Sequence, residues 1–307
     1  MKQLNWQGVF PALLTPFTSN DQVDDSMFDK NLAAQVAAGV NGIILGGSLG
    51  EASSLLNEEK YALVTHAKSQ LKGSVPVVMN IAEQTTRAAI ESAHAAEKAG
   101  ADGLMLLPPM RYKADDRETV AFFKAVAANT SLSLMIYNNP IDYKIMVTLD
   151  MFEELAALPN IQAVKESTRD TTNVTRMINR FGNRFRILGG VDTLALECLL
   201  IGADGWVAGL VDAFPQETVA IYRLAKAGRI QEALAIYRWF MPVLELDIQP
   251  KLVQYIKMAA EATGIGSEYV RAPRLVLEGE ERQRVTKVIQ DALANRPALP
   301  AYLNIPV

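Results

Sequence analysis

The chain has 307 residues, of which 50% are hydrophobic and 21% are charged, a balance typical of a globular protein and not of a disordered one. Its 30 basic and 34 acidic residues give a net charge of −4 without a long basic run, so neither nucleic acid nor an anionic membrane is an expected partner. No stretch reaches the roughly 18 apolar residues of a membrane span and the N-terminus lacks the apolar segment of a signal peptide, so we expect a cytoplasmic protein that acts on a small molecule.

Eight apolar runs of strand length recur along the chain. They cover residues 9–14, 43–46, 76–80, 104–107, 132–137, 161–165, 185–189 and 205–208. Amphipathic helical patterns separate them, for example over Glu58–Leu71, Thr86–Ala99 and Met151–Leu158. Eight alternations of strand and helix predict an α/β fold, a closed (β/α)8 TIM barrel. An open doubly wound sheet is the rival fold, but the glycine-rich phosphate loop typical of it does not follow the first run.

A short phrase recurs before three of the predicted strands. It reads Ala-Gly-Val-Asn-Gly from residue 38, Ala-Gly-Ala-Asp-Gly from residue 99 and Ile-Gly-Ala-Asp-Gly from residue 201. The first glycine of each phrase suits the left-handed conformation that closes a helix, and the second permits a tight entry into a strand. The phrase therefore predicts a helix end followed by a strand, as in a serial βα architecture.

Helical periodicity continues beyond the eighth unit, over Ile230–Phe240, Lys251–Thr263 and Glu280–Ala294. Prolines at 242, 250 and 273 are expected to separate these helices. No flexible linker precedes them, so we divide the chain into a catalytic barrel, residues 1–228, and a helical extension, residues 229–307, packed on that barrel.

A lysine and a tyrosine end two successive apolar runs. Lys165 follows Ile161–Val164, and Tyr137 ends the run before it, about one βα unit earlier. Consecutive parallel strands are usually neighbours about 4.8 Å apart, so both side chains are expected together at the carboxyl edge, where TIM barrels have their active sites. Apolar surroundings lower the proton affinity of a lysine, which then attacks a ketone as a nucleophile, while a nearby tyrosine moves protons. We therefore predict a Schiff base at Lys165.

Two other interpretations of these residues stay open at this point. Lys165 can form a structural ion pair with Glu166 or another carboxylate, and Tyr137 can be simply the aromatic end of a strand. The two histidines, His66 and His94, fall within helical patterns and are expected at the surface. Neither a zinc site nor a Ser-His-Asp triad is therefore easy to assemble.

The second apolar run ends in a glycine-rich segment, Gly46-Gly47-Ser48-Leu49-Gly50-Glu51. In a barrel the second strand lies across the mouth from the sixth, so Ser48 is expected to face Lys165. Backbone N–H groups there can bind a carboxylate, and the Ser48 hydroxyl can add a donor or relay a proton to Tyr137. The alternative is a tight turn with a helix cap.

The seventh run ends in Gly189-Gly190-Val191-Asp192. Its glycines are expected to leave room for a substrate. Asp192 is expected mainly to cap the helix that follows.

Four motifs follow one another along the whole chain in an order and at a spacing that resemble those of the N-acetylneuraminate lyase / dihydrodipicolinate synthase superfamily. They are Gly47-Ser48-Leu49-Gly50-Glu51, Tyr137-Asn138-Asn139-Pro140, Val164-Lys165-Glu166-Ser167-Thr168 and Gly190-Val191-Asp192. The resemblance implies a Schiff-base lyase that needs no cofactor and no metal and assembles as a homotetramer. It implies Lys165 and Tyr137 as catalytic residues, and we add Ser48 from its expected place opposite Lys165. The candidates for substrate binding are Gly47, Leu49, Ser167, Gly190, Asp192 and Asn139.

The sequence departs from the family pattern at positions that distinguish substrates. Leu49 stands where the family usually has a second hydroxyl. Asp142 stands where dihydrodipicolinate synthases have an arginine that holds the carboxylate of the aldehyde substrate. Those enzymes also donate a tyrosine across the dimer interface from the loop after strand four, and the counterpart here is Met110 or Arg111, or Tyr112 if the loop shifts.

These departures direct the choice of substrate toward hydroxylated or sugar-derived 2-oxo acids or related cyclic imines. The leading candidate is a deaminase of pyrroline-4-hydroxy-2-carboxylate. Dihydrodipicolinate synthase and a 2-keto-3-deoxy sugar acid aldolase are the alternatives. A barrel that binds a keto acid as a sensor, without turnover, is the non-enzymatic alternative.

Overall fold

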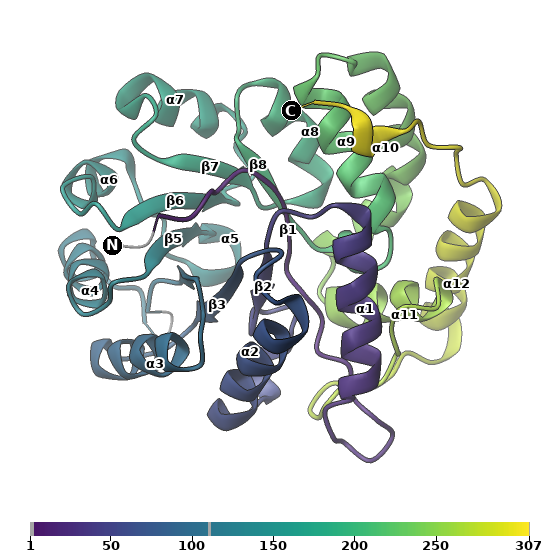
Figure 1. Ribbon diagram of the computed structural model, residues 1–307, viewed down its shortest axis with the longest axis horizontal. Helices are drawn as coiled ribbons and strands as arrows, with labels where there is room; N and C mark the ends of the chain where they lie inside the picture. Colours follow the sequence, from purple (N-terminus) through teal and green to yellow (C-terminus); the bar gives the residue numbers. More distant parts are fainter. Residues whose placement is uncertain (1–2, 110–111, 307) are drawn as a thin grey trace.

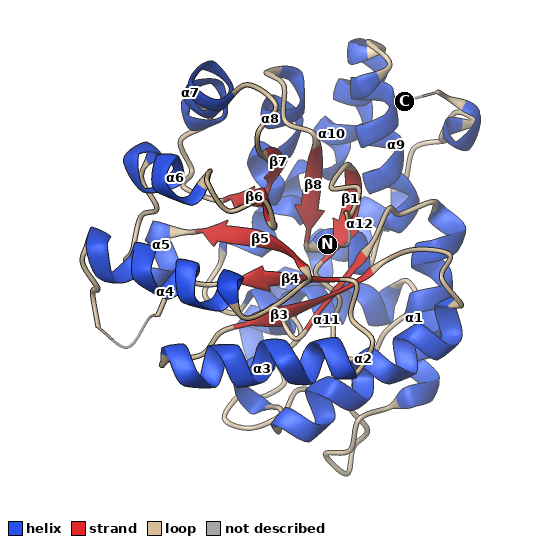
Figure 2. Cartoon of the chain, turned by 60° about the vertical axis from the view of Figure 1, so that its left-hand side comes forward, coloured by secondary structure: helices blue, strands red, loops and turns tan. Residues whose placement is uncertain are grey.

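Eight parallel strands form a nearly closed ring inside a shell of helices (Figures 1 and 2). The computed structural model describes residues 3–109 and 112–306. The strands are β1 (Gly8–Pro11), β2 (Ile43–Leu45), β3 (Val77–Ile81), β4 (Gly103–Leu106), β5 (Ser133–Asn138), β6 (Ile161–Glu166), β7 (Arg186–Gly189) and β8 (Gly205–Ala208). Neighbours pair in the order β1-β8-β7-β6-β5-β4-β3-β2. The predicted (β/α)8 TIM barrel is confirmed.

The ring closes between the first two strands just beyond the end of β1. Ala12 bridges Ile44 in parallel, and the Leu13 N–H donates to the Ile44 carbonyl at 2.9 Å. This is also where the sequence prediction was least accurate, because it continued the first strand to residue 14. The residues after Pro11 are apolar and buried, but beyond the Ala12 bridge they leave the ladder.

Helices cover the outside of the ring, as Figure 2 shows. The barrel helices are α1 (Asp25–Ala38), α2 (Asn57–Leu71), α3 (Thr86–Lys98), α4 (Asp116–Ala128), α5 (Pro140–Tyr143), α6 (Leu149–Leu155), α7 (Thr172–Phe181), α8 (Ala195–Leu200) and α9 (Pro215–Lys226). The three recurring phrases behave as predicted, because Gly39, Gly100 and Gly202 have φ values of 88°, 96° and 114°. Each of these glycines reverses the chain between a helix and the next strand.

The C-terminal region adds α10 (Ile230–Leu244), α11 (Leu252–Ala262) and α12 (Gly279–Ala294), which lie together at one side of the barrel in Figure 1. The expected break at Pro242 is wrong, since α10 continues through this proline to Leu244. α10 packs on α8 and α9, and the Trp239 indole N–H donates to the Ala292 carbonyl at 3.0 Å, which joins α10 to α12. The extension thus consists of helices packed on the barrel. The domain boundary near residue 228 stays a prediction.

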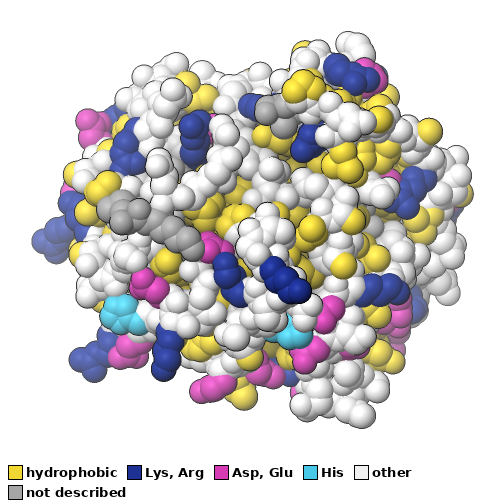
Figure 3. Space-filling model, viewed as in Figure 1, with side chains coloured by type: hydrophobic (Ala, Val, Ile, Leu, Met, Phe, Trp, Pro, Cys, Tyr) yellow, Lys and Arg dark blue, Asp and Glu magenta, His cyan; other side chains and the backbone are white. Residues whose placement is uncertain are grey.

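The surface carries charges of both signs. Figure 3 shows basic and acidic side chains interspersed over the face in view. Among the described residues, no helix is long and apolar enough to cross a membrane.

Candidate active site

The carboxyl ends of the strands surround a cavity of about 90 Å³. Segments at or near the ends of seven strands contribute to its wall, and so do three residues of the extension, Asp247, Ile248 and Leu252. Eight of the nine residues singled out from the sequence line it: Gly47, Ser48, Leu49, Tyr137, Asn139, Lys165, Ser167 and Gly190. The position agrees with the end of a TIM barrel where active sites are built.

Lys165 is buried at the end of β6, directly beside Tyr137 on β5. Its Nζ lies 4.0 Å from the centroid of the Tyr137 ring. Burial lowers the pKa of Lys165, against the opposing influence of Tyr143, Asp247 and two further aspartates. The lowered pKa increases the fraction of uncharged amine, the form that can act as a nucleophile.

Glu166, the next residue, is not the partner of Lys165. Its carboxylate accepts hydrogen bonds from the Thr168 N–H at 2.8 Å and from the Asn173 amide at 2.7 Å. Side chains alternate along a strand, which directs Glu166 away from the lysine. Among the described residues no ion pair includes Lys165, so the interpretation of Lys165 as half of a structural pair finds no support.

Tyr137 is buried as well, and its hydroxyl accepts a hydrogen bond from the Asn139 amide at 3.1 Å. The same amide donates to Asp142 at 2.7 Å. Burial raises the pKa of Tyr137 to about 12, against the opposing effect of the Asn139 hydrogen bond. The phenol is therefore protonated at neutral pH and can serve as a proton donor.

The Ser48 hydroxyl bonds to a residue that the sequence analysis did not select. Its Oγ lies 2.6 Å from the hydroxyl of Tyr143, the last residue of α5, and not within a hydrogen bond of Tyr137 as expected. Tyr143 also lines the cavity, and its ring meets that of Tyr137 edge to face with centroids 5.4 Å apart. No sequence pattern marked Tyr143, because it lies in a short polar stretch after Pro140.

The space around residue 190 leaves no room for a side chain larger than that of glycine. A Cβ at this position would lie 2.2 Å from Ser167 Oγ and 2.6 Å from Lys165 Cγ. The expected room is thus used by the lysine and serine side chains themselves.

Asp192 does not line the cavity, and the expectation that it caps the following helix is wrong. Its buried carboxylate accepts from the Trp206 indole at 2.9 Å and from the N–H groups of Gly209 and Leu210, at 3.1 Å and 2.7 Å. These donors lie on β8 and just beyond it, so Asp192 ties the end of β7 to that of β8.

A buried ion pair fixes the loop that carries Ser48. Glu51, at the end of the loop, has a φ of 55° and lies 2.5 Å from the Nζ of Lys257 on α11. The backbone N–H of Arg271 donates to its other oxygen at 3.1 Å. The extension therefore holds the β2 loop against the barrel mouth.

Two carboxylates stand at the cavity wall. Asp142, noted above as a departure from the family, lines it from α5, and Asp247 reaches it from the extension. Burial and the nearby Asp192 raise the pKa of Asp247 to about 8, with Lys165 opposing the shift. Sequence reasoning missed Asp247, since a lone aspartate among C-terminal helices carries no local signal.

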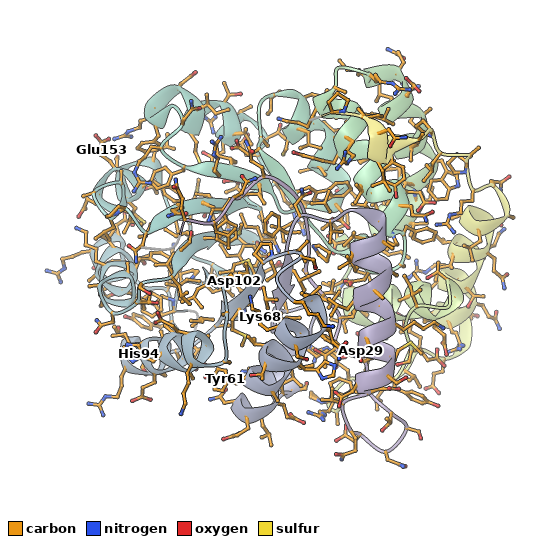
Figure 4. The ribbon with its side chains drawn as sticks, viewed as in Figure 1. Asp29, Tyr61, Lys68, His94, Asp102 and Glu153 are labelled. Atoms are coloured by element: carbon orange, nitrogen blue, oxygen red, sulfur yellow. The ribbon has the colours of Figure 1, made fainter. Side chains whose placement is uncertain are left out.

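Other expectations concern residues away from this cavity. Met110 and Arg111 lie outside the described residues, and Tyr112 is exposed and absent from the cavity wall. His66 contacts Asp29 at 2.6 Å, and His94, visible on the outer ring in Figure 4, contacts the Asn129 carbonyl at 2.7 Å. Within residues 3–109 and 112–306, no three His, Cys, Asp or Glu side chains gather as a metal site.

Comparisons of the sequence and of the structure with known proteins point to the same family. The model of the dihydrodipicolinate synthetase family matches residues 5–292. The 4-hydroxy-tetrahydrodipicolinate synthase of Exiguobacterium sibiricum is 33% identical over 275 residues, 89% of this chain and 92% of the relative. The enzyme of the same name from Sorangium cellulosum is 32% identical over 305 residues, which cover 97% of this chain and 100% of the relative. A crystal structure of dihydrodipicolinate synthase from Bacillus anthracis superposes with a TM-score of 0.91, at 27% identity, covering 96% of this chain and 100% of that one.

Proposed function

Because this chain belongs to the dihydrodipicolinate synthetase family, whose members are lyases, we propose that it acts through a Schiff base between Lys165 and a 2-oxo acid. The observation that carries this proposal is the buried amine of Lys165, with its lowered pKa, beside a protonated Tyr137 in one cavity. The protonated imine withdraws electrons from the adjacent carbons, which permits formation or cleavage of a carbon–carbon bond, or loss of a hydroxyl or amino group. The backbone around Ser48 and Leu49 is the proposed carboxylate site.

The first candidate reaction is that of 4-hydroxy-tetrahydrodipicolinate synthase, the addition of pyruvate to aspartate semialdehyde. Two relatives that share about a third of their residues with this chain over nearly their whole length carry this name. They support this reaction better than the deaminase that the sequence analysis placed first.

A second candidate is the deamination of a hydroxylated cyclic imine, and one observation favours it. Asp142 lines the cavity where the family's synthases have an arginine for the aldehyde's carboxylate, and Asp247, whose pKa is raised to about 8, supplies no positive charge in its place. A hydroxyl or a protonated imine nitrogen would instead find hydrogen-bond acceptors there.

Three incubations separate these reactions, with products followed by mass. They contain pyruvate with aspartate semialdehyde, the imine derived from hydroxyproline, and 2-keto-3-deoxy sugar acids. Turnover of the first mixture alone supports the synthase, and turnover of the imine alone supports the deaminase. A trapped Schiff base without product from any mixture supports the keto-acid sensor and removes the proposed catalysis.

The assembly and the compartment are further parts of this proposal. We infer a homotetramer in the cytoplasm, from the resemblance set out above. Light scattering during size-exclusion chromatography tests the assembly, and a monomer mass at micromolar concentration contradicts it. Cell fractionation tests the compartment, and recovery with the membrane fraction contradicts it.

A further inference from the structure

Two hydroxyl groups from distant parts of the chain meet at the cavity. Ser48, in the loop after β2, and Tyr143, at the end of α5, are 95 residues apart, and their oxygens lie 2.6 Å apart. Ser48 is exposed, Tyr143 is half-buried and Lys165 is buried. The three side chains therefore run from the solvent inward, and all three line the cavity.

The hydroxyl of Tyr143 contacts the exposed Ser48, whereas that of Tyr137 accepts from the buried Asn139. The Nζ of Lys165 lies over the face of the Tyr137 ring, 4.0 Å from its centroid, whereas the hydroxyl of a tyrosine lies in the plane of its ring at the edge. Asn139 holds that hydroxyl at 3.1 Å. Tyr143 lines the same cavity as Lys165, and its ring meets the Tyr137 ring edge to face with centroids 5.4 Å apart.

We propose that Tyr143 is the acid that protonates the substrate oxygen while the Schiff base forms, and that Ser48 returns protons to it from solvent. This inference rests on the proposed function. Neutral Nζ adds to the carbonyl carbon, the electrons of the broken π bond move to oxygen, and Tyr143 protonates that oxygen. The new ammonium returns one proton to Tyr143. A second proton from Tyr143 then lets the hydroxyl leave as water, the nitrogen lone pair closes the protonated imine, and Ser48 reprotonates the phenolate.

The surroundings of Tyr143 fit this role. Burial raises the pKa of Tyr143, with Tyr137 and Asp142 acting in the same direction and Ser48 and Lys165 against it, so the phenol holds its proton at neutral pH. A serine hydroxyl donates one hydrogen bond while it accepts another, which a proton path requires.

The test is the rate of Schiff-base formation with pyruvate, measured by rapid mixing and quenching with borohydride. Tyr143→Phe keeps the ring and removes the hydroxyl, so the final labelled fraction should stay as in the wild type while the rate falls about 10²-fold or more. Tyr61→Phe is the matched control. Tyr61 also contacts a serine, Ser92 at 3.3 Å, but it lies on α2 in the outer ring (Figure 4), and this variant should react at the wild-type rate.

Ser48→Ala is the second variant and should slow the same step. The double variant should be no slower than Tyr143→Phe alone, because both residues belong to one path. A wild-type rate in Tyr143→Phe overturns the inference, and if that variant does not fold, a wild-type rate in Ser48→Ala overturns it. An unlabelled wild-type protein contradicts the proposed function instead, so the two failures are distinguishable.

Discussion

Lys165 and Tyr137 are direct neighbours across β6 and β5, and the amine lies over the face of the phenol ring, 4.0 Å from its centroid. We therefore propose two separate roles for Tyr137. Its face packs against the amine and helps to bury it, while its hydroxyl, which accepts a hydrogen bond from Asn139, is the proposed proton donor.

Replacement of Tyr137 by phenylalanine separates these roles. The ring and its packing remain, so the melting temperature should change little. Turnover should fall by roughly 10²–10⁴-fold, the usual contribution of a general acid or base. Steady-state kinetics on the best substrate found among the three mixtures measures this, and near-normal turnover would remove the Tyr137 hydroxyl from the mechanism.

The buried pair of Glu51 and Lys257 predicts a large loss of stability when one partner is removed. Glu51→Gln should lower the free energy of unfolding by about 3–5 kcal/mol, because it leaves the Lys257 amine buried without its carboxylate. Urea denaturation measures the loss. Glu232→Gln breaks the exposed pair with Arg229, 2.6 Å apart, and serves as the control that should unfold like the wild type. Equal stability of all three proteins would show that the buried pair does not hold the loop.

Gly190→Ala tests the packing of the lysine. The added Cβ would lie 2.6 Å from Lys165 Cγ, so the amine must move. A displacement of about 1 Å at a reacting group costs on the order of 10²-fold in rate, and we expect at least that loss with circular dichroism unchanged. Retained activity would show that the lysine side chain adapts to the methyl group.

The barrel and its lysine could be predicted because their signals are local. Each strand is an apolar run a few residues long, and a lysine at the end of such a run stands out without any knowledge of its neighbours. The contact between Ser48 and Tyr143 had no such signal, since it joins two loops 95 residues apart. Asp247 reaches the cavity only through the packing of the extension, and Asp192 is engaged by donors at the end of β8.

Burial of Lys165 also predicts how stability depends on pH. The pKa of Lys165 is lower in the folded protein than in the unfolded chain, where a lysine has a pKa of about 10.4. Between these two values the unfolded chain binds more protons, so the contribution of this residue to the unfolding free energy rises with pH. Lys165→Met lacks this dependence.

The methionine variant should therefore be more stable than the wild type at neutral pH. Its advantage should shrink as the pH rises toward about 10.4. Thermal denaturation of both proteins across this range provides the check. A constant difference between them at every pH would indicate that the amine is charged and satisfied in the folded state.

The most direct measurement of the central claim is peptide mapping after incubation with pyruvate and borohydride. The account predicts a stable adduct on the peptide that contains Lys165, at one adduct per chain, and none in Lys165→Ala. Lys257, also buried and with a lowered pKa, should stay unlabelled because Glu51 holds it outside the cavity. An adduct that persists in Lys165→Ala, or that maps to Lys257, would contradict the account.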